Sequence, residues 1–111
     1  MLFDPKWNET IPEVEIKPNK IGKILIDSLA LIQKKGWCQY AFHSADDSYC
    51  MVGAICEKAT NYTDTMRALD LLKQVTGADD IPVWNDQLGR THKEVYDAFR
   101  KAIELAGRTG R

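Results

Sequence analysis

With 111 residues, the chain is long enough for one domain with one modest hydrophobic core and too short for two such cores. Hydrophobic residues make up 44% and charged residues 28% of the sequence, which is typical of globular proteins and disfavours a disordered or fibrous chain. The formal net charge is only -1, so nucleic acid binding would need a local basic patch and is not expected.

The beginning of the chain does not have the features of a targeting segment. Residues 1–6 contain no basic stretch followed by an apolar one, and no apolar run approaches the roughly 18 residues that would cross a bilayer. Three cysteines are an odd number in a chain without an export signal, which favours reduced thiols. We therefore expect a cytoplasmic protein with no membrane partner.

The first 18 residues are predicted to form an extended N-terminal arm. They contain three of the four prolines, and residues 13–16 alternate between acidic and apolar side chains, as an edge strand does. Trp7 is the expected anchor of this arm on the rest of the protein. The arm could also exchange onto a second copy of the chain, which would give a homodimer.

Residues 19–107 contain four segments in which apolar residues recur at intervals of three and four, the spacing of one helix face. The first predicted helix begins after Asn19, a good N-cap, and ends at Gly36. The second follows a cap at Asp47 or Ser48. In this second helix, the neighbouring small residues 53 and 54 would let another backbone approach closely.

The third predicted helix begins at Thr63 and ends at Gly77. The fourth begins with a capping box, in which the hydroxyl of Thr91 and the carboxylate of Glu94 each accept a hydrogen bond from the other residue's backbone N–H. It is expected to end near Gly107, which leaves residues 108–111 as a frayed tail.

The predicted fold is therefore mainly α, a compact four-helix domain with an extended N-terminal arm. An α+β alternative stays open, because residues 37–43 also alternate weakly between polar and apolar side chains. A small β element would then form from residues 13–16 and 37–43.

The predicted loop 81–90 combines tryptophan, asparagine, aspartate and arginine in one short segment. It precedes the last helix and is held at its C-terminal side by the cap of that helix, which makes it a candidate binding surface or structural hub. Two interpretations compete for it. In the first, Asn85 and Asp86 bond to the backbone, Arg90 pairs with Asp86, and Trp84 completes the core, so the loop is a structural hub. In the second, the same side chains form a binding surface together with Trp37.

A thiol enzyme is the alternative from a different functional class. Cys50 would lie in the first turn of the second helix, where the helix dipole lowers the pKa of a thiol. His43 or His92 would act as its base, and Asp86 would orient that base. These residue types occur together by chance in most chains of this size, so the sequence favours a protein without catalytic residues.

Neither a metal nor a cofactor is expected. Zinc could be bound by thiolates and imidazole, but the chain has no pair of cysteines separated by two residues, and Cys56 lies nearly two turns after Cys50. The glycine-rich motifs of nucleotide-binding proteins and the nucleophile motif of α/β-hydrolases do not occur.

Three stretches carry a resemblance to a known family: G-W-C-Q (36–39), C-M-V-G-A-I (50–55) and W-N-D-Q-L-G-R-T-H-K-E-V (84–95). Over about residues 20–106 the chain resembles a family of small uncharacterised proteins of bacteria and their phages, a domain of unknown function with the signature W-N-D-x-x-G-R-T-x-x-E-V. The resemblance implies that these stretches form one spatial group. The chain departs from the family pattern at Tyr40, where a glycine is frequent, and Cys38 and His92 fall at positions that the pattern leaves open.

We therefore expect a small non-enzymatic binding module, of phage or bacterial origin, for a protein partner or a small molecule. Its predicted binding residues lie in the two polar-aromatic segments and at the start of the second helix. They are Trp37, Gln39, Cys50, Trp84, Asn85, Asp86, Arg90 and Thr91.

Overall fold

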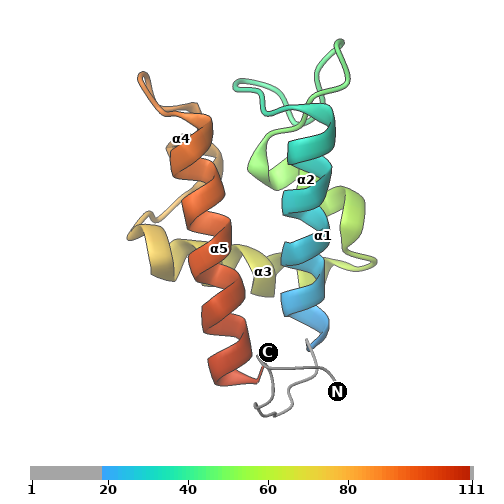
Figure 1. Ribbon diagram of the computed structural model, residues 1–111, viewed down its shortest axis with the longest axis vertical. Coiled ribbons are helices and arrows are strands. Elements are labelled where there is room, and N and C mark those ends of the chain that lie inside the picture. Colours follow the sequence, from blue (N-terminus) through green and yellow to red (C-terminus); the bar gives the residue numbers. More distant parts are fainter. Residues whose placement is uncertain (1–18, 111) are drawn as a thin grey trace, which may run out of the picture.

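The computed structural model describes residues 19–110, and in this part of the chain it contains five helices and no sheet. The helices are α1 (Lys20–Lys35), α2 (Met51–Lys58), α3 (Tyr62–Thr76), α4 (Ile81–Asp86) and α5 (His92–Thr109). The two long helices α1 and α5 lie side by side and run in opposite directions, and α3 crosses behind them (Figure 1). The prediction of a mainly α domain is confirmed. The N-terminal arm, with the proposed strand at 13–16, the anchor Trp7 and the arm exchange, lies outside the described residues.

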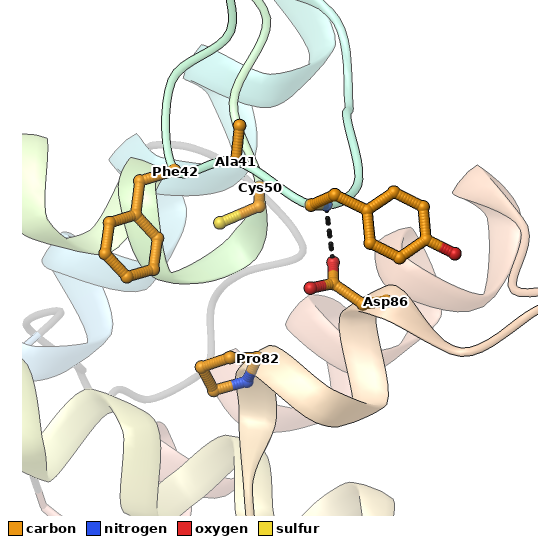
Figure 2. Close-up of a pocket in the computed structure, with 6 residues that line it drawn as sticks. Ala41, Phe42, Cys50, Pro82 and Asp86 are labelled. Atoms are coloured by element: carbon orange, nitrogen blue, oxygen red, sulfur yellow. Dashed lines mark hydrogen bonds between the residues drawn. The ribbon is translucent and has the colours of Figure 1, made fainter.

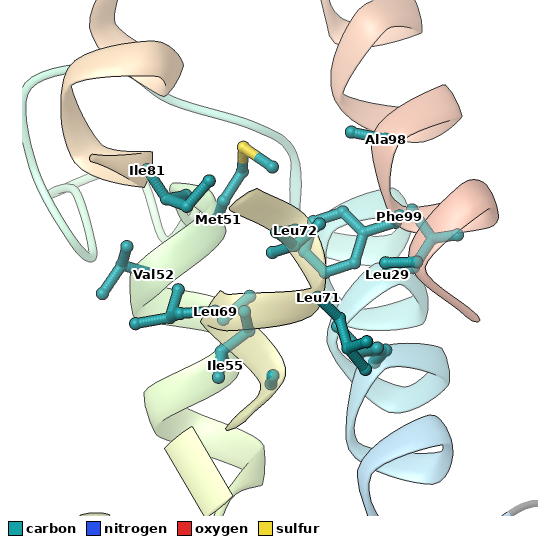
Figure 3. Close-up of a cluster of buried hydrophobic side chains, with 14 of the residues drawn as sticks. Leu29, Met51, Val52, Ile55, Leu69, Leu71, Leu72, Ile81, Ala98 and Phe99 are labelled. Carbon is teal, nitrogen blue, oxygen red and sulfur yellow. The ribbon is translucent and has the colours of Figure 1, made fainter. Parts of the chain in front are cut away.

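The core forms where α1, α3 and α5 meet. Phe99 of α5 is fully buried and lies against Leu72 of α3 and Leu29 of α1 (Figure 3). At the other end of the same cluster, Ile81 of α4 packs beside Met51 of α2. The short helix α4 is therefore attached to the core by an apolar side chain, which fixes its position next to α2.

The helix ends follow the predicted caps at the starts of α1 and α5. Asn19 accepts a hydrogen bond from the backbone N–H of Gly22 at 2.7 Å, and the capping box of Thr91 and Glu94 is present in both directions.

The predicted cap of α2 at Asp47 or Ser48 is wrong, because Cys50 caps this helix by accepting the N–H of Gly53 at 3.3 Å and so precedes the helix instead of lying in its first turn. The third helix begins one residue earlier than predicted, because Asn61 caps it by accepting from the N–H of Asp64 at 2.8 Å.

The C-terminal helix is longer than expected. It continues through Gly107 to Thr109 and stops at Gly110, which has a left-handed backbone with φ of 77°. Since Gly107 has no positive φ, it is an ordinary helical residue and not the cap. The real stop signal is the second glycine of the tail.

The α+β alternative is wrong for the described residues. Residues 37–43 form no strand; they belong to the loop between α1 and α2, which makes only isolated bridges from Tyr49 to Trp37 and to His43. The loop folds back on itself instead, because the N–H of Tyr49 donates to Gly36 and its carbonyl accepts from Cys38. We call residues 36–50 the α1–α2 loop.

The predicted loop 81–90 is half helix, which corrects the sequence-based assignment. Asp80 accepts a hydrogen bond from the N–H of Val83 at 3.0 Å and so caps α4, and Pro82 occupies its first turn. Proline is well suited to this position because its missing N–H would have no partner in a helix anyway.

The close approach predicted for the second helix is confirmed at Gly53. A Cβ atom on this residue would lie 1.9 Å from the carbonyl oxygen of Phe42. That same carbonyl accepts the N–H of Cys50 at 3.1 Å. The α1–α2 loop can therefore cross the start of α2 only because residue 53 is glycine.

Candidate functional site

The centre of the polar-aromatic region is the side chain of Asn85, which is fully buried. Its oxygen accepts from the indole N–H of Trp37 at 2.7 Å and from the backbone N–H of Met51 at 3.2 Å. Its amide group donates to the carbonyl of Cys38 at 3.1 Å and to Asp86 at 2.9 Å. All four hydrogen bonds that an asparagine side chain can make are thus made inside the protein, and they join α4, α2 and the α1–α2 loop.

Gln39 reinforces the same junction from the α1–α2 loop. Its amide group donates to the backbone carbonyls of Asn85 at 3.0 Å and of Gln87 at 2.9 Å. These carbonyls lie at the C-terminal end of α4, where the helix itself provides no partner. Gln39 is therefore a side-chain cap for the short helix.

Trp84 and Arg90 form a second brace, on the segment that connects α4 to α5. The guanidinium carbon of Arg90 lies 3.7 Å from the centre of the Trp84 ring, and its Nε donates to the Trp84 carbonyl at 2.9 Å. The guanidinium also pairs with Glu94 at 3.1 Å and hydrogen-bonds to Gln87. The expected pairing of Arg90 with Asp86 is therefore wrong, because stacking on the indole turns the arginine towards α5.

The capping box completes this brace. The backbone N–H of Thr91 donates to Glu94 at 2.9 Å, and this hydrogen bond is the main reason why the pKa of Glu94 lies below its usual value. Thr91 itself is exposed. Its contribution is to hold the start of α5 and the end of the connecting segment together.

Next to the buried asparagine is a cavity of about 340 Å³, which we call the Asp86 pocket. Its lining comes from the α1–α2 loop, the start of α2 and α4. The lining residues are Tyr40, Ala41, Phe42, Cys50, Pro82 and Asp86. Pro82 and Asp86 face the loop from α4, and Phe42 and Cys50 lie on the opposite side (Figure 2). The volume falls in the range of small-molecule binding sites.

Asp86 is the charged group of this pocket. Its Oδ1 accepts hydrogen bonds from the backbone N–H of Tyr40 at 2.9 Å and from Asn85. The other carboxylate oxygen points into the space between Phe42, Cys50 and Pro82 (Figure 2). The carboxylate thus has one oxygen engaged in holding the loop and one directed into the cavity.

Two aromatic side chains of the loop stand open to solvent at this pocket. Tyr40 is 71% exposed and Phe42 is 61% exposed. Tyr40 also has a φ of 68°, a left-handed conformation that costs a non-glycine residue about 1 kcal/mol or more. Strained backbone of this kind is concentrated at functional sites, and the strain explains why glycine suits this position.

Cys50 lacks the features that activate a thiol. It is only 3% exposed, it caps α2 by accepting the N–H of Gly53 at 3.3 Å, and burial raises the pKa of its thiol. A nucleophilic thiol needs a lowered pKa. The hydrogen bonds of the described residues include none between Cys50 and an imidazole: His43 stacks on Tyr49 and contacts Asp47 at 2.6 Å instead.

Metal ligation finds no support either in the part of the chain that the structure describes. Between residues 19 and 110, no three His, Cys, Asp or Glu side chains converge so as to hold an ion.

The predicted binding residues thus fall into two groups. Trp37, Gln39 and Asn85 converge on the junction behind the pocket, where Cys50 and Asp86 contribute to its lining. Trp84, Arg90 and Thr91 belong to the brace beside it. The lining residues Tyr40, Ala41, Phe42 and Pro82 were not predicted, although the glycine that the resemblance led us to expect at position 40 was a usable signal for an unusual backbone.

The chain matches the model of one protein family over residues 17–105, and that model is described as a family of unknown function (DUF6197). No curated protein and no solved structure matches the chain. None of the helices described is long and apolar enough to cross a membrane.

Proposed function

Since the chain belongs to this family of unknown function, we propose its function from the geometry of the site: it is a non-enzymatic binding module that holds a small ligand or a side chain of a protein partner in the Asp86 pocket. One observation carries the proposal. A cavity with a carboxylate oxygen directed into it is bordered by two exposed aromatic rings and is built on fully hydrogen-bonded supports.

The supports matter because binding costs less when the site is already formed. Asn85 uses all of its hydrogen bonds to fix α4 against the α1–α2 loop. Gln39 caps the same helix. The walls of the pocket are therefore held in place without a ligand, and the predicted surface residues act here mainly by positioning Asp86 and Tyr40.

Further parts of the proposal rest on the sequence. The W-N-D-x-x-G-R-T-x-x-E-V signature supports a bacterial or phage origin, and the three free cysteines of the described residues support a reducing, cytoplasmic location. The near-neutral net charge supports a partner other than nucleic acid. The alternative of a thiol enzyme centred on Cys50 has less support, because burial and a raised pKa keep that thiol protonated.

A fragment titration followed by two-dimensional amide NMR tests the proposal. Fragments that bind should shift the amide signals of Tyr40, Phe42 and Asp86 together. Phe42→Ala should weaken binding about tenfold by removing an aromatic wall. Tyr62→Ala is the matched control, since Tyr62 is 77% exposed and does not line the pocket.

The result that would refute the binding module is clear. Either no fragment shifts the pocket amides, or the shifts concentrate elsewhere and Phe42→Ala and Tyr62→Ala have equal effects.

A further inference from the structure

We infer that the Asp86 pocket recognises a cation carried on an apolar stem, a primary ammonium or guanidinium group. This inference rests on the proposed function and specifies its ligand class. The charge would meet the free oxygen of Asp86, and the stem would lie against the apolar lining of the cavity.

The first support is the state of the Asp86 carboxylate. Within residues 19–110 it forms no ion pair with a lysine, arginine or histidine, although it faces a cavity. The other half-buried or buried carboxylates of the described chain are all paired with a basic side chain; they are Asp27, Asp47, Asp64 and Asp97. A ligand cation would supply to Asp86 the partner that the protein supplies elsewhere.

The second support is the distribution of charge around the pocket. Among the described residues, the lining of the pocket contains one carboxylate, that of Asp86, and no lysine, arginine or histidine. Asp47, elsewhere in the α1–α2 loop, is already paired with Lys35 at 2.8 Å. The charge of Asp86 is therefore not balanced by a basic side chain of the lining, so it favours a cation over an anion in the cavity.

The third support is the chemistry of the lining. Tyr40 and Phe42 present aromatic groups at the mouth of the pocket, and the face of an aromatic ring attracts a cation. Pro82 and Ala41 provide apolar surface for a hydrocarbon stem, and Cys50, which is only 3% exposed, adds a small part of its side chain. Because burial raises the pKa of Cys50, its thiol stays neutral and adds no second charge near the carboxylate.

The fourth support links the carboxylate to the aromatic wall. The N–H of Tyr40 donates to Asp86 Oδ1 at 2.9 Å, and Tyr40 has the left-handed backbone that a glycine would adopt more easily. The chain thus keeps a bulky exposed aromatic residue at a strained position beside its unpaired carboxylate. A role of the ring in contacting a ligand accounts for that arrangement.

Two matched probes test the inference: benzylamine, which is cationic at neutral pH, and benzyl alcohol, which has the same ring and a neutral polar end. Amide NMR titrations at low salt should show benzylamine binding at the pocket at least about tenfold more tightly, since a charge-assisted hydrogen bond is the stronger one. Asp86→Asn keeps an acceptor for Tyr40 and should abolish this preference. Asp79→Asn makes the same change in net charge outside the pocket and should preserve it.

A second measurement covers the case in which Asp86→Asn does not fold. Raising the salt concentration should weaken the binding of benzylamine to the wild-type protein and leave that of benzyl alcohol unchanged. Equal affinities of the two probes, with Phe42→Ala weakening both, would overturn the cation inference and leave the binding module intact. Failure of both probes to shift the pocket amides, together with a failed fragment titration, would overturn both.

The affinities of two further ligands show whether the cation comes from a protein partner or from a small molecule. The ligands are a short peptide with one central lysine and the same peptide with that lysine acetylated. Tighter binding of the unmodified peptide than of benzylamine would assign the cation to a protein partner. Tighter binding of benzylamine would assign it to a free small molecule. Binding of the acetylated peptide with the same affinity as the unmodified one would contradict the inference.

Discussion

At the scale of single residues, Asn85 has the most consequences. Its side chain is buried and makes all four of its hydrogen bonds, two as acceptor and two as donor. An ionised aspartate has the same shape but cannot replace it, because a carboxylate has no N–H to donate. The sequence offered both interpretations of this residue, hub and binding surface. It could not decide between them, because three of the four partners of Asn85 lie 34 to 48 residues away in the chain.

Asn85→Asp tests this junction. The substitution removes the donor to the carbonyl of Cys38 and places a buried negative charge beside Asp86, so we expect a loss of about 2–4 kcal/mol of unfolding free energy. Chemical denaturation measures it. Gln74→Glu is the control, because it makes the same change of group at an exposed position of α3; a similar loss in both proteins would contradict the assigned role.

Tyr40 allows a second prediction at this scale. Because its φ is 68°, Tyr40→Gly should be more stable than Tyr40→Ala by about 1 kcal/mol, although both remove the aromatic ring. Thermal unfolding of the two variants measures the difference. If alanine proves as stable as glycine, the left-handed backbone at this position is wrong.

At the scale of secondary structure, the long helices were predictable and the short one was not. The periodic apolar positions and the capping box identified the helices that became α1, α2, α3 and α5. Helix α4 has only six residues, too few to show a helical period, although Asp80 followed by Pro82 resembles a helix start. Its existence depends on contacts with α2 and the α1–α2 loop, which the sequence does not display.

The two glycines of α2 and α5 give a paired prediction. Gly53→Ala would force a Cβ to within 1.9 Å of the Phe42 carbonyl, so we expect it to destabilise the protein by about 2–3 kcal/mol or more. Gly107→Ala meets nothing within 4 Å inside α5 and should stabilise it by about 0.5–1 kcal/mol. Denaturant melts compare them; an unharmed Gly53→Ala protein would rule out the close crossing of the loop.

At the scale of the whole molecule, several ion pairs of the described chain join basic residues of α1 and α5 to acidic ones, as Lys20 of α1 pairs with Asp64 of α3 at 2.9 Å. The pairing extends to the α1–α2 loop, where Lys35 contacts Asp47 at 2.8 Å. Asp86 has no such partner within residues 19–110. The formal net charge of -1 predicted a nearly neutral domain, but it could not show which carboxylates lack a basic partner, because that depends on which side chains the fold brings together.

Acid sensitivity follows from the paired carboxylates. The hydrogen bond from Lys20 lowers the pKa of Asp64 below its unfolded value. The resulting stability is fully present above the unfolded pKa of about 4 and is lost as the pH falls through the lower folded pKa. Asp64→Asn should therefore reduce the loss of stability between neutral pH and pH 3, as measured by thermal melts across that range. An unchanged pH profile would show that this pair does not contribute.

The four hydrogen bonds of Asn85 also bear on how the protein opens. The amide proton of Met51 is held by the Asn85 side chain and that of Tyr40 by the neighbouring Asp86, so both depend on the position of one short helix. A fluctuation that lifts α4 away would release both protons in the same event and dismantle a wall of the cavity with them. The amide protons of Met51 and Tyr40 would then exchange with solvent at the same rate. A bound ligand would dissociate at a rate limited by the same opening.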